Sequence, residues 1–100
     1  MDVNRALRSA TQTGTVLLGL RETVKAIEDK KAKLVVIAEN ALASDAEKVQ
    51  GLAAKNKVPV YRFHGKNTEL GPACGKPFSV AVLSVLEAGE SDVLALAREK

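Results

Sequence analysis

The run Leu34-Val35-Val36-Ile37-Ala38 contains five consecutive apolar residues and is followed by Glu39-Asn40. A strand with one face in water alternates apolar and polar side chains, whereas a strand covered on both faces is apolar throughout. We therefore expect residues 34–38 to form a strand that is buried on both faces.

Helical patterns lie on either side of this strand. Residues 20–29 repeat apolar side chains at helical spacing, and residues 44–57 do the same with a weaker stripe. Ser44-Asp45-Ala46-Glu47 is typical of a capping box, in which the Ser44 oxygen accepts a helix amide and Glu47 accepts the Ser44 amide. The second helix is therefore expected to begin at Ser44.

The rest of the chain continues the alternation of helices and strands. We expect a helix from residue 3 to about Gly14, strands over 15–18, 58–63 and 80–86, an irregular Pro72-containing helix from Asn67 or Thr68 through Cys74, and a short strand or helical turn over 91–97. Pro59 lacks a ladder donor and hints that its strand lies at a sheet edge. The alternation predicts one α/β domain over residues 1–100, a three-layer α/β/α sandwich with a largely parallel sheet.

Composition narrows the class of protein. The 100 residues are 46% hydrophobic and 27% charged, as is typical of a globular domain. No apolar run approaches the roughly 18 residues of a membrane span, and the first residues do not form a signal peptide. A single cysteine excludes an intrachain disulfide and a cysteine-based zinc site. These features indicate an intracellular protein that does not associate with membranes.

The net charge of +3 is unevenly distributed along the chain. Residues 1–66 carry twelve basic and seven acidic side chains, whereas residues 67–100 carry three basic and five acidic ones. A basic body with an acidic tail suits a polyanionic partner that binds one surface. The alternative is ordinary surface charge, because a few residues set the balance in so short a chain.

Three loops are candidates for a binding site, because strand-to-helix junctions of such sheets cluster at one edge. The first, residues 18–22, opens a helix whose exposed Arg21 and Lys25 could follow a nucleic-acid backbone. The second is Glu39-Asn40-Ala41, directly after the buried strand, and the third is the turn Gly75 to Ser79. Each loop alone is also compatible with plain solvated surface.

Phe78 in the third loop has two interpretations. The chain has only three aromatic residues, so that a small core would be expected to use all of them. In the first interpretation Phe78 points inward and starts the core face of the following strand. In the second its ring is a platform for an unstacked nucleobase, with Lys76 close to a phosphate.

The sequence argues against an enzyme. His64 and Cys74 are the only residues of their kinds, and no sequence feature places them together. We expect His64 to be exposed in a turn and Cys74 to be a small buried group. No Walker loop, dinucleotide fingerprint, acid–base pair or metal-ligand cluster occurs, so no catalytic residue, cofactor or metal is expected. A small metabolite-binding or thiol enzyme of α/β type remains the competing class.

The three loops together resemble a known family. Residues 19–28 (GLRETVKAIE) and 32–40 (AKLVVIAEN) are similar to the signature of the kink-turn RNA-binding superfamily, which includes the seven-A-e ribosomal proteins. Residues 75–80 (GKPFSV) and 87–94 (EAGESDVL) resemble its thirty-e branch, a large-subunit ribosomal protein family of archaea and eukaryotes. The match extends over nearly the whole chain.

The resemblance implies a sheet of four strands that mixes parallel and antiparallel pairs, and a structural role without catalysis. It implies binding to a kink-turn or internal loop of ribosomal RNA in the cytoplasmic large ribosomal subunit, beside neighbouring ribosomal proteins, by a chain that is a monomer when free. The alternative is a kink-turn RNA-binding component of a non-ribosomal ribonucleoprotein, or an RNA-binding regulator. The residues implied in RNA binding are Gly19, Arg21, Glu22, Lys25, Asn40, Gly75, Lys76 and Phe78.

Overall fold

The chain folds into a four-stranded sheet between two layers of helices, as seen in a computed structural model that describes residues 2–98. The elements in chain order are α1 (Val3–Thr13), β1 (Thr15–Leu18), α2 (Leu20–Glu28), β2 (Leu34–Ala38), α3 (Ala43–Lys55), β3 (Val60–Phe63), α4 (Asn67–Ala73), β4 (Val82–Glu87) and the 3₁₀ helix η1 (Val93–Arg98). The predicted α/β/α sandwich is confirmed, and residues 91–97 take the helical of their two expected forms.

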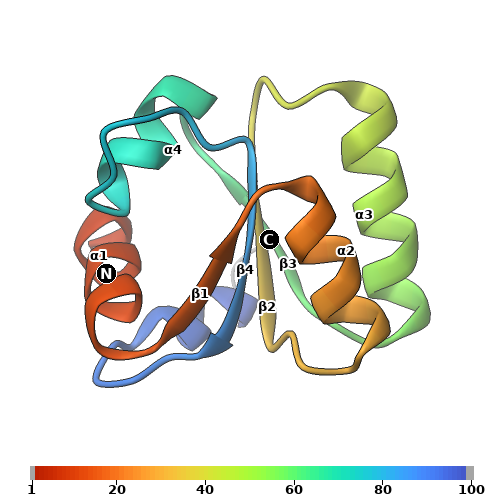
Figure 1. Cartoon of the computed structure of the whole chain (residues 1–100), viewed down its shortest axis with the longest axis horizontal. Coiled ribbons are helices and arrows are strands. Elements are labelled where there is room, and N and C mark those ends of the chain that lie inside the picture. The colour runs from red at the N-terminus through yellow and green to blue at the C-terminus, as the bar shows by residue number, and fades with distance from the viewer. Residues whose placement is uncertain (1, 99–100) are drawn as a thin grey trace.

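The helices divide between the two faces of the sheet (Figure 1). On one face, α1, α4 and η1 pack on side chains such as Val36 and Leu83, whereas α2 and α3 cover the other face at Val35 and Ile37. All five residues of β2 are fully buried, as the apolar run predicts. The coverage of both faces explains why this strand has no polar alternation.

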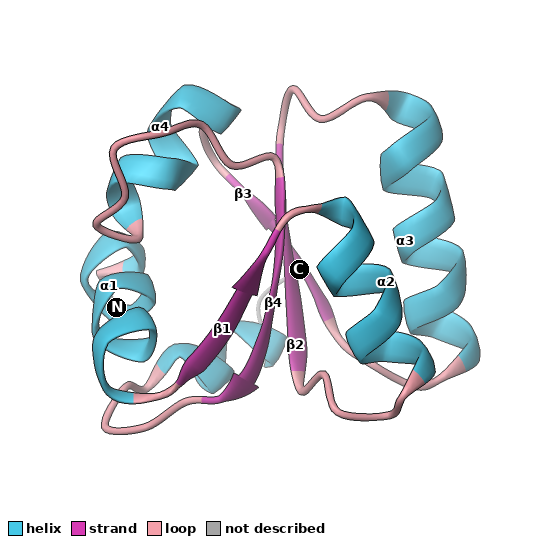
Figure 2. Ribbon diagram, viewed as in Figure 1, coloured by secondary structure: helices cyan, strands magenta, loops and turns pink. Residues whose placement is uncertain are grey.

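The strand order is β1-β4-β2-β3, and the expectation of a largely parallel sheet was wrong (Figure 2). Only β2 and β3 are parallel, because β4 lies antiparallel between β1 and β2. The physical reason is the connection before β4. Helix α4 has only seven residues, about 10 Å at 1.5 Å per residue, and does not return the chain to the other end of the sheet. The chain therefore enters β4 at the edge where β3 ends.

Two helix starts differ from the expected ones. Helix α3 begins at Ala43, and Leu42 at its N-cap makes no side-chain cap bond, so the capping box predicted at Ser44 was wrong. Ser44 is already inside the helical turn, where its oxygen no longer has the extended geometry of a cap. In α4 the N-cap is Lys66, whose backbone amide donates to the Glu69 carboxylate at 3.1 Å.

Proline positions agree with the sheet and modify the helix. Pro59 directly precedes β3, which is an edge strand as expected. Pro72 lies inside α4, and the helix nevertheless continues to Ala73. The short, irregular helix that we expected is thus a seven-residue helix that retains its α-helical form through Pro72.

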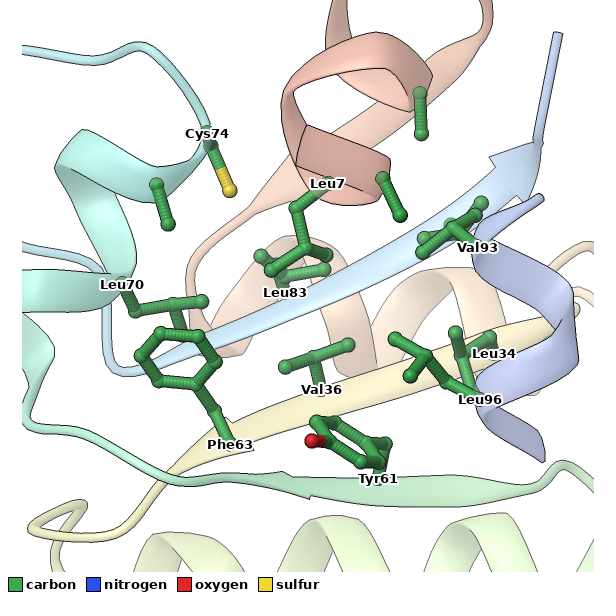
Figure 3. Packing of buried hydrophobic residues seen from close by; sticks show 14 of the residues in the cluster. Leu7, Leu34, Val36, Tyr61, Phe63, Leu70, Cys74, Leu83, Val93 and Leu96 are labelled. Carbon is green, nitrogen blue, oxygen red and sulfur yellow. The ribbon is translucent and has the colours of Figure 1, made fainter. Parts of the chain in front are cut away.

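Two of the three aromatic residues contribute to the larger core cluster (Figure 3). Tyr61 and Phe63 are each 6% exposed and lie beside Leu70 and Val36. Cys74 is 2% exposed, and its sulfur points into the same cluster, which confirms the expectation of a small buried group. Phe78 takes no part in this cluster and is 52% exposed.

Candidate nucleic-acid interface

The three candidate loops meet at one edge of the sheet, at the top of Figure 1. The Gly19 amide donates to the Val82 carbonyl at 2.8 Å, and the Ala38 amide donates to the Ala81 carbonyl at 2.8 Å. These bonds join the ends of β1 and β2 to the segment that enters β4. Residues from loops that are 20 to 60 positions apart in the chain are therefore held together by backbone hydrogen bonds.

The first loop turns at Gly19, which is the N-cap of α2. Its φ of 104° is rarely accessible to side-chain-bearing residues, and a Cβ there would meet no protein atom within 4 Å. The space beside this backbone is thus open to a ligand. Arg21, Glu22 and Lys25 follow on exposed positions of α2. Arg21 and Lys25 line a hollow of about 450 Å³ that also includes Lys48 of α3.

The second loop is fixed by a reciprocal amide pair. The Asn40 Nδ2 donates to Asn67 Oδ1 at 2.9 Å, and the Asn67 backbone amide donates to Asn40 Oδ1 at 2.7 Å. Asn40 therefore supplies an acceptor to the first turn of α4 and joins the second loop to the third helix. Both side-chain groups of Asn40 are exposed, and each retains one further hydrogen-bonding position.

The third loop leaves α4 through a C-cap that requires glycine. Gly75 has a φ of 80°, its amide donates to Pro72, and the Lys76 amide donates to Gly71 at 3.0 Å. This pair of bonds is a Schellman motif. Gly75 therefore ends the helix, a role that its sequence position beside Phe78 did not indicate.

Phe78 lies on the loop surface and not in the core. Strand β4 begins at Val82, four residues later than Phe78, so the interpretation of Phe78 as the first core residue of the strand was wrong. Lys76 is half-buried, whereas Pro77 and Ser79 are exposed. An exposed ring beside a lysine has the arrangement that base stacking needs.

Sequence reasoning missed several residues that build this surface. A Cβ on Gly71 would lie 1.7 Å from the Phe78 carbonyl oxygen, so the third loop can pass α4 only beside a glycine. The Arg8 side chain of α1 lies beside Gly75, at 3.6 Å from the position of a Cβ there. The one local signal was Gly71 itself, since glycine inside a helix usually has a packing reason.

The residues that a thiol enzyme would need do not form a reactive pair. Burial raises the pKa of the Cys74 thiol above its usual value, and a Thr11 hydrogen bond and the Lys76 charge only partly oppose this effect. His64 is exposed, as expected, with its ring edge-on to Tyr61 at 6.0 Å. A thiol with a raised pKa is a poor nucleophile.

Two searches over the part of the chain that the structure describes returned nothing. Residues 2–98 contain no group of three His, Cys, Asp or Glu side chains able to hold a metal ion. Within the same residues, no helix has the length and apolar character that crossing a membrane requires.

Comparison with known proteins agrees with this geometry. The profile of the ribosomal protein L7Ae/L30e/S12e/Gadd45 family matches residues 1–95. The large ribosomal subunit protein eL30 of Methanospirillum hungatei is 47% identical over 98 residues, which cover 98% of this chain and 100% of that protein. The eL30 of Methanosarcina mazei is 45% identical over 95 residues, which cover 95% of this chain and 88% of that protein.

A solved structure supports the fold independently. A Bacillus halodurans protein of unknown function has a TM-score of 0.85 and 28% identity, with 98% of each chain covered. The eL30 relatives carry ribosomal-protein names and not enzyme names, in agreement with the expectation that this chain is not an enzyme. The chain therefore belongs to the ribosomal protein L7Ae/L30e/S12e/Gadd45 family, and within it to the L30e branch.

Proposed function

We propose that the chain is a structural constituent of the large ribosomal subunit and binds a kink-turn or internal loop of ribosomal RNA. The observation that carries the proposal is the joining of three loops at one sheet edge, with the exposed Phe78 ring on one side and Arg21 and Lys25 on the other. The names of the eL30 relatives support the ribosomal assignment.

Each part of this surface suits distorted RNA. A kink splays bases out of the stack and crowds phosphates, so that RNA can be recognised by shape together with a few unstacked bases. Phe78 would stack on one such base, and the open backbone at Gly19 would allow close approach of the RNA. Arg21, Lys25 and Lys76 would lie near phosphates. Asn40 would use its remaining hydrogen-bonding positions on a base edge.

Glu22 has a different role in this proposal. As a carboxylate it repels phosphates, but it can accept a hydrogen bond from a base amino group. Gly75 acts through the backbone, because its Schellman motif sets the direction in which the loop bearing Phe78 leaves α4. The RNA-binding set proposed here therefore combines three cationic contacts, two polar base contacts, one stacking ring and two glycines.

The setting follows from the same proposal. The chain would be a monomer when free and would lie in the cytoplasm on the ribosome, in contact with ribosomal RNA and neighbouring large-subunit proteins. Its folding provides no obstacle to a monomeric state, since the core clusters on both sheet faces are covered by helices of the same chain. Sedimentation of the free protein checks this part.

The experiment that tests RNA recognition compares two ligands. A kink-turn RNA and a straight RNA duplex of equal length and charge are each titrated with the protein at several salt concentrations. We expect tighter binding of the kink-turn RNA at every salt concentration, since only that RNA offers a splayed base to Phe78. Equal affinity for both RNAs would contradict specific recognition.

A further inference from the structure

A second group of cations lies at the opposite end of the sheet from the three loops. Lysines precede both parallel strands, in the α2–β2 and α3–β3 connections, and the two connections lie at the bottom of Figure 1. The Val35 amide donates to the Pro59 carbonyl at 3.0 Å, which holds the starts of β2 and β3 together. We call this group the lysine end; it consists of Lys30, Lys31, Lys33, Lys55 and Lys57, all exposed.

The backbone at the lysine end indicates selection for the charge. Lys30 and Lys57 each have a φ of 59°, directly after the C-caps of α2 and α3. Glycine or asparagine is the usual residue at this left-handed position, because a Cβ is strained there. A lysine that only compensates the helix dipole could lie in the last helical turn, as Lys55 does, without this strain.

The neighbouring acids do not neutralise the group. Lys33 is paired with Glu87 at 3.3 Å, and both side chains are at least half exposed. Glu28 and Asp29 at the end of α2 are the other acids in the same connections. Five lysines against these three carboxylates leave a net charge of +2. A hollow of about 340 Å³ between Lys30, Lys33 and Glu87 makes this end concave.

The composition of the lysine end fits phosphates better than a protein surface. Its connections, residues 29–33 and 55–59, contain no aromatic residue and no arginine. Protein interfaces are enriched in both of these and depleted in lysine. Lysine is a mobile point charge that neutralises phosphates without reading bases.

We propose that the lysine end binds the phosphate backbone of a second RNA segment, independently of base sequence, so that the chain bridges two RNA segments. This inference rests on the proposed binding of a first RNA segment at the three loops. The two surfaces face opposite ways along β2, whose five residues span about 16 Å. One straight segment therefore does not reach both surfaces.

The test measures a ternary complex. Protein bound to a labelled kink-turn RNA is titrated with a second labelled straight duplex, and energy transfer between the two labels reports bridging. We expect bridging for the native chain. For Lys30→Gln with Lys57→Gln, bridging should weaken, and the slope of log K for the duplex against log salt should fall by about 2, while kink-turn affinity is unchanged.

Two control variants separate location from charge and from folding. Arg5→Gln with Arg62→Gln removes two exposed charges elsewhere and should leave bridging intact. Lys30→Gly with Lys57→Gly should weaken bridging without lowering the melting temperature, because glycine relieves the left-handed strain. Equal weakening by the arginine pair, or persistence of bridging in both lysine variants, would overturn the proposal.

The outcome also distinguishes this inference from the proposed function. Displacement of the kink-turn RNA by the duplex means that both use one surface, and it overturns the bridging alone. Absence of kink-turn binding contradicts the three-loop proposal, and with it the bridge. In that case a binary titration with duplex still decides whether the lysine end binds phosphates, by comparing the lysine and arginine pairs.

Discussion

Replacement of Phe78 by alanine separates RNA stacking from a role in folding. Full burial of a phenylalanine side chain stabilises a protein by about 1.5–3 kcal/mol, and Phe78 is 52% exposed. Its truncation should therefore reduce the free energy of unfolding by about 1 kcal/mol. The same truncation should cost about 1–3 kcal/mol of RNA binding, or about 5- to 150-fold in Kd.

Phe63→Ala is the matched control, because it removes the same side chain from the core. Phe63 is 6% exposed, and truncation of a buried phenylalanine costs about 3–5 kcal/mol of stability. Urea unfolding of both variants measures the stability losses, and titration with kink-turn RNA measures the Kd of Phe78→Ala. A stability loss of Phe78→Ala close to that of Phe63→Ala, or an unchanged Kd, would refute the stacking role.

Three further predictions follow from single contacts. Gly71→Ala should lower stability by about 1–3 kcal/mol and weaken RNA binding, because its Cβ would collide with the Phe78 carbonyl; Gly51→Ala in open space on α3 should instead be neutral or stabilising, and equal unfolding curves would contradict the contact. Lys25→Ala should weaken binding to kink-turn and straight RNA alike and reduce the salt slope by about 1; an unchanged slope would exclude a phosphate contact. The stability advantage of the native chain over Cys74→Ala should be constant near neutral pH and decline above about pH 9.0, because the folded pKa is raised and the unfolded thiol loses its proton first; a difference that stays flat at high pH would argue against the buried thiol.

Local patterns in the sequence were sufficient for much of the fold. The apolar run of residues 34–38 predicted a strand buried on both faces, and the helical repeat of residues 20–29 predicted α2. Pro59 indicated an edge strand for the same kind of local reason, since a missing amide is tolerated there. Periodicity and special residues report burial and hydrogen-bonding capacity, and both are set within a few positions of each residue.

Helix boundaries were less predictable. The Ser44 pattern satisfied the capping-box rule, yet α3 begins one residue earlier with no side-chain cap. The cause is tertiary, because the path from β2 to the packed face of α3 sets where the first helical turn can form. Gly75 likewise followed no local rule for a binding residue, and its Schellman role depends on where α4 ends.

Residue identity alone therefore carried the order of elements, the buried strand, the three candidate loops and the family resemblance. Tertiary structure decided the direction of β4, the pairing of Asn40 with Asn67, the passage of the third loop beside Gly71 and the gathering of five lysines at one end. These features join residues that are distant in the chain, and their geometry depends on how each connection returns to the sheet. A short α4 that leaves the chain at the same edge is enough to reverse β4 and to bring Phe78 beside Gly19 and Asn40 as part of one surface.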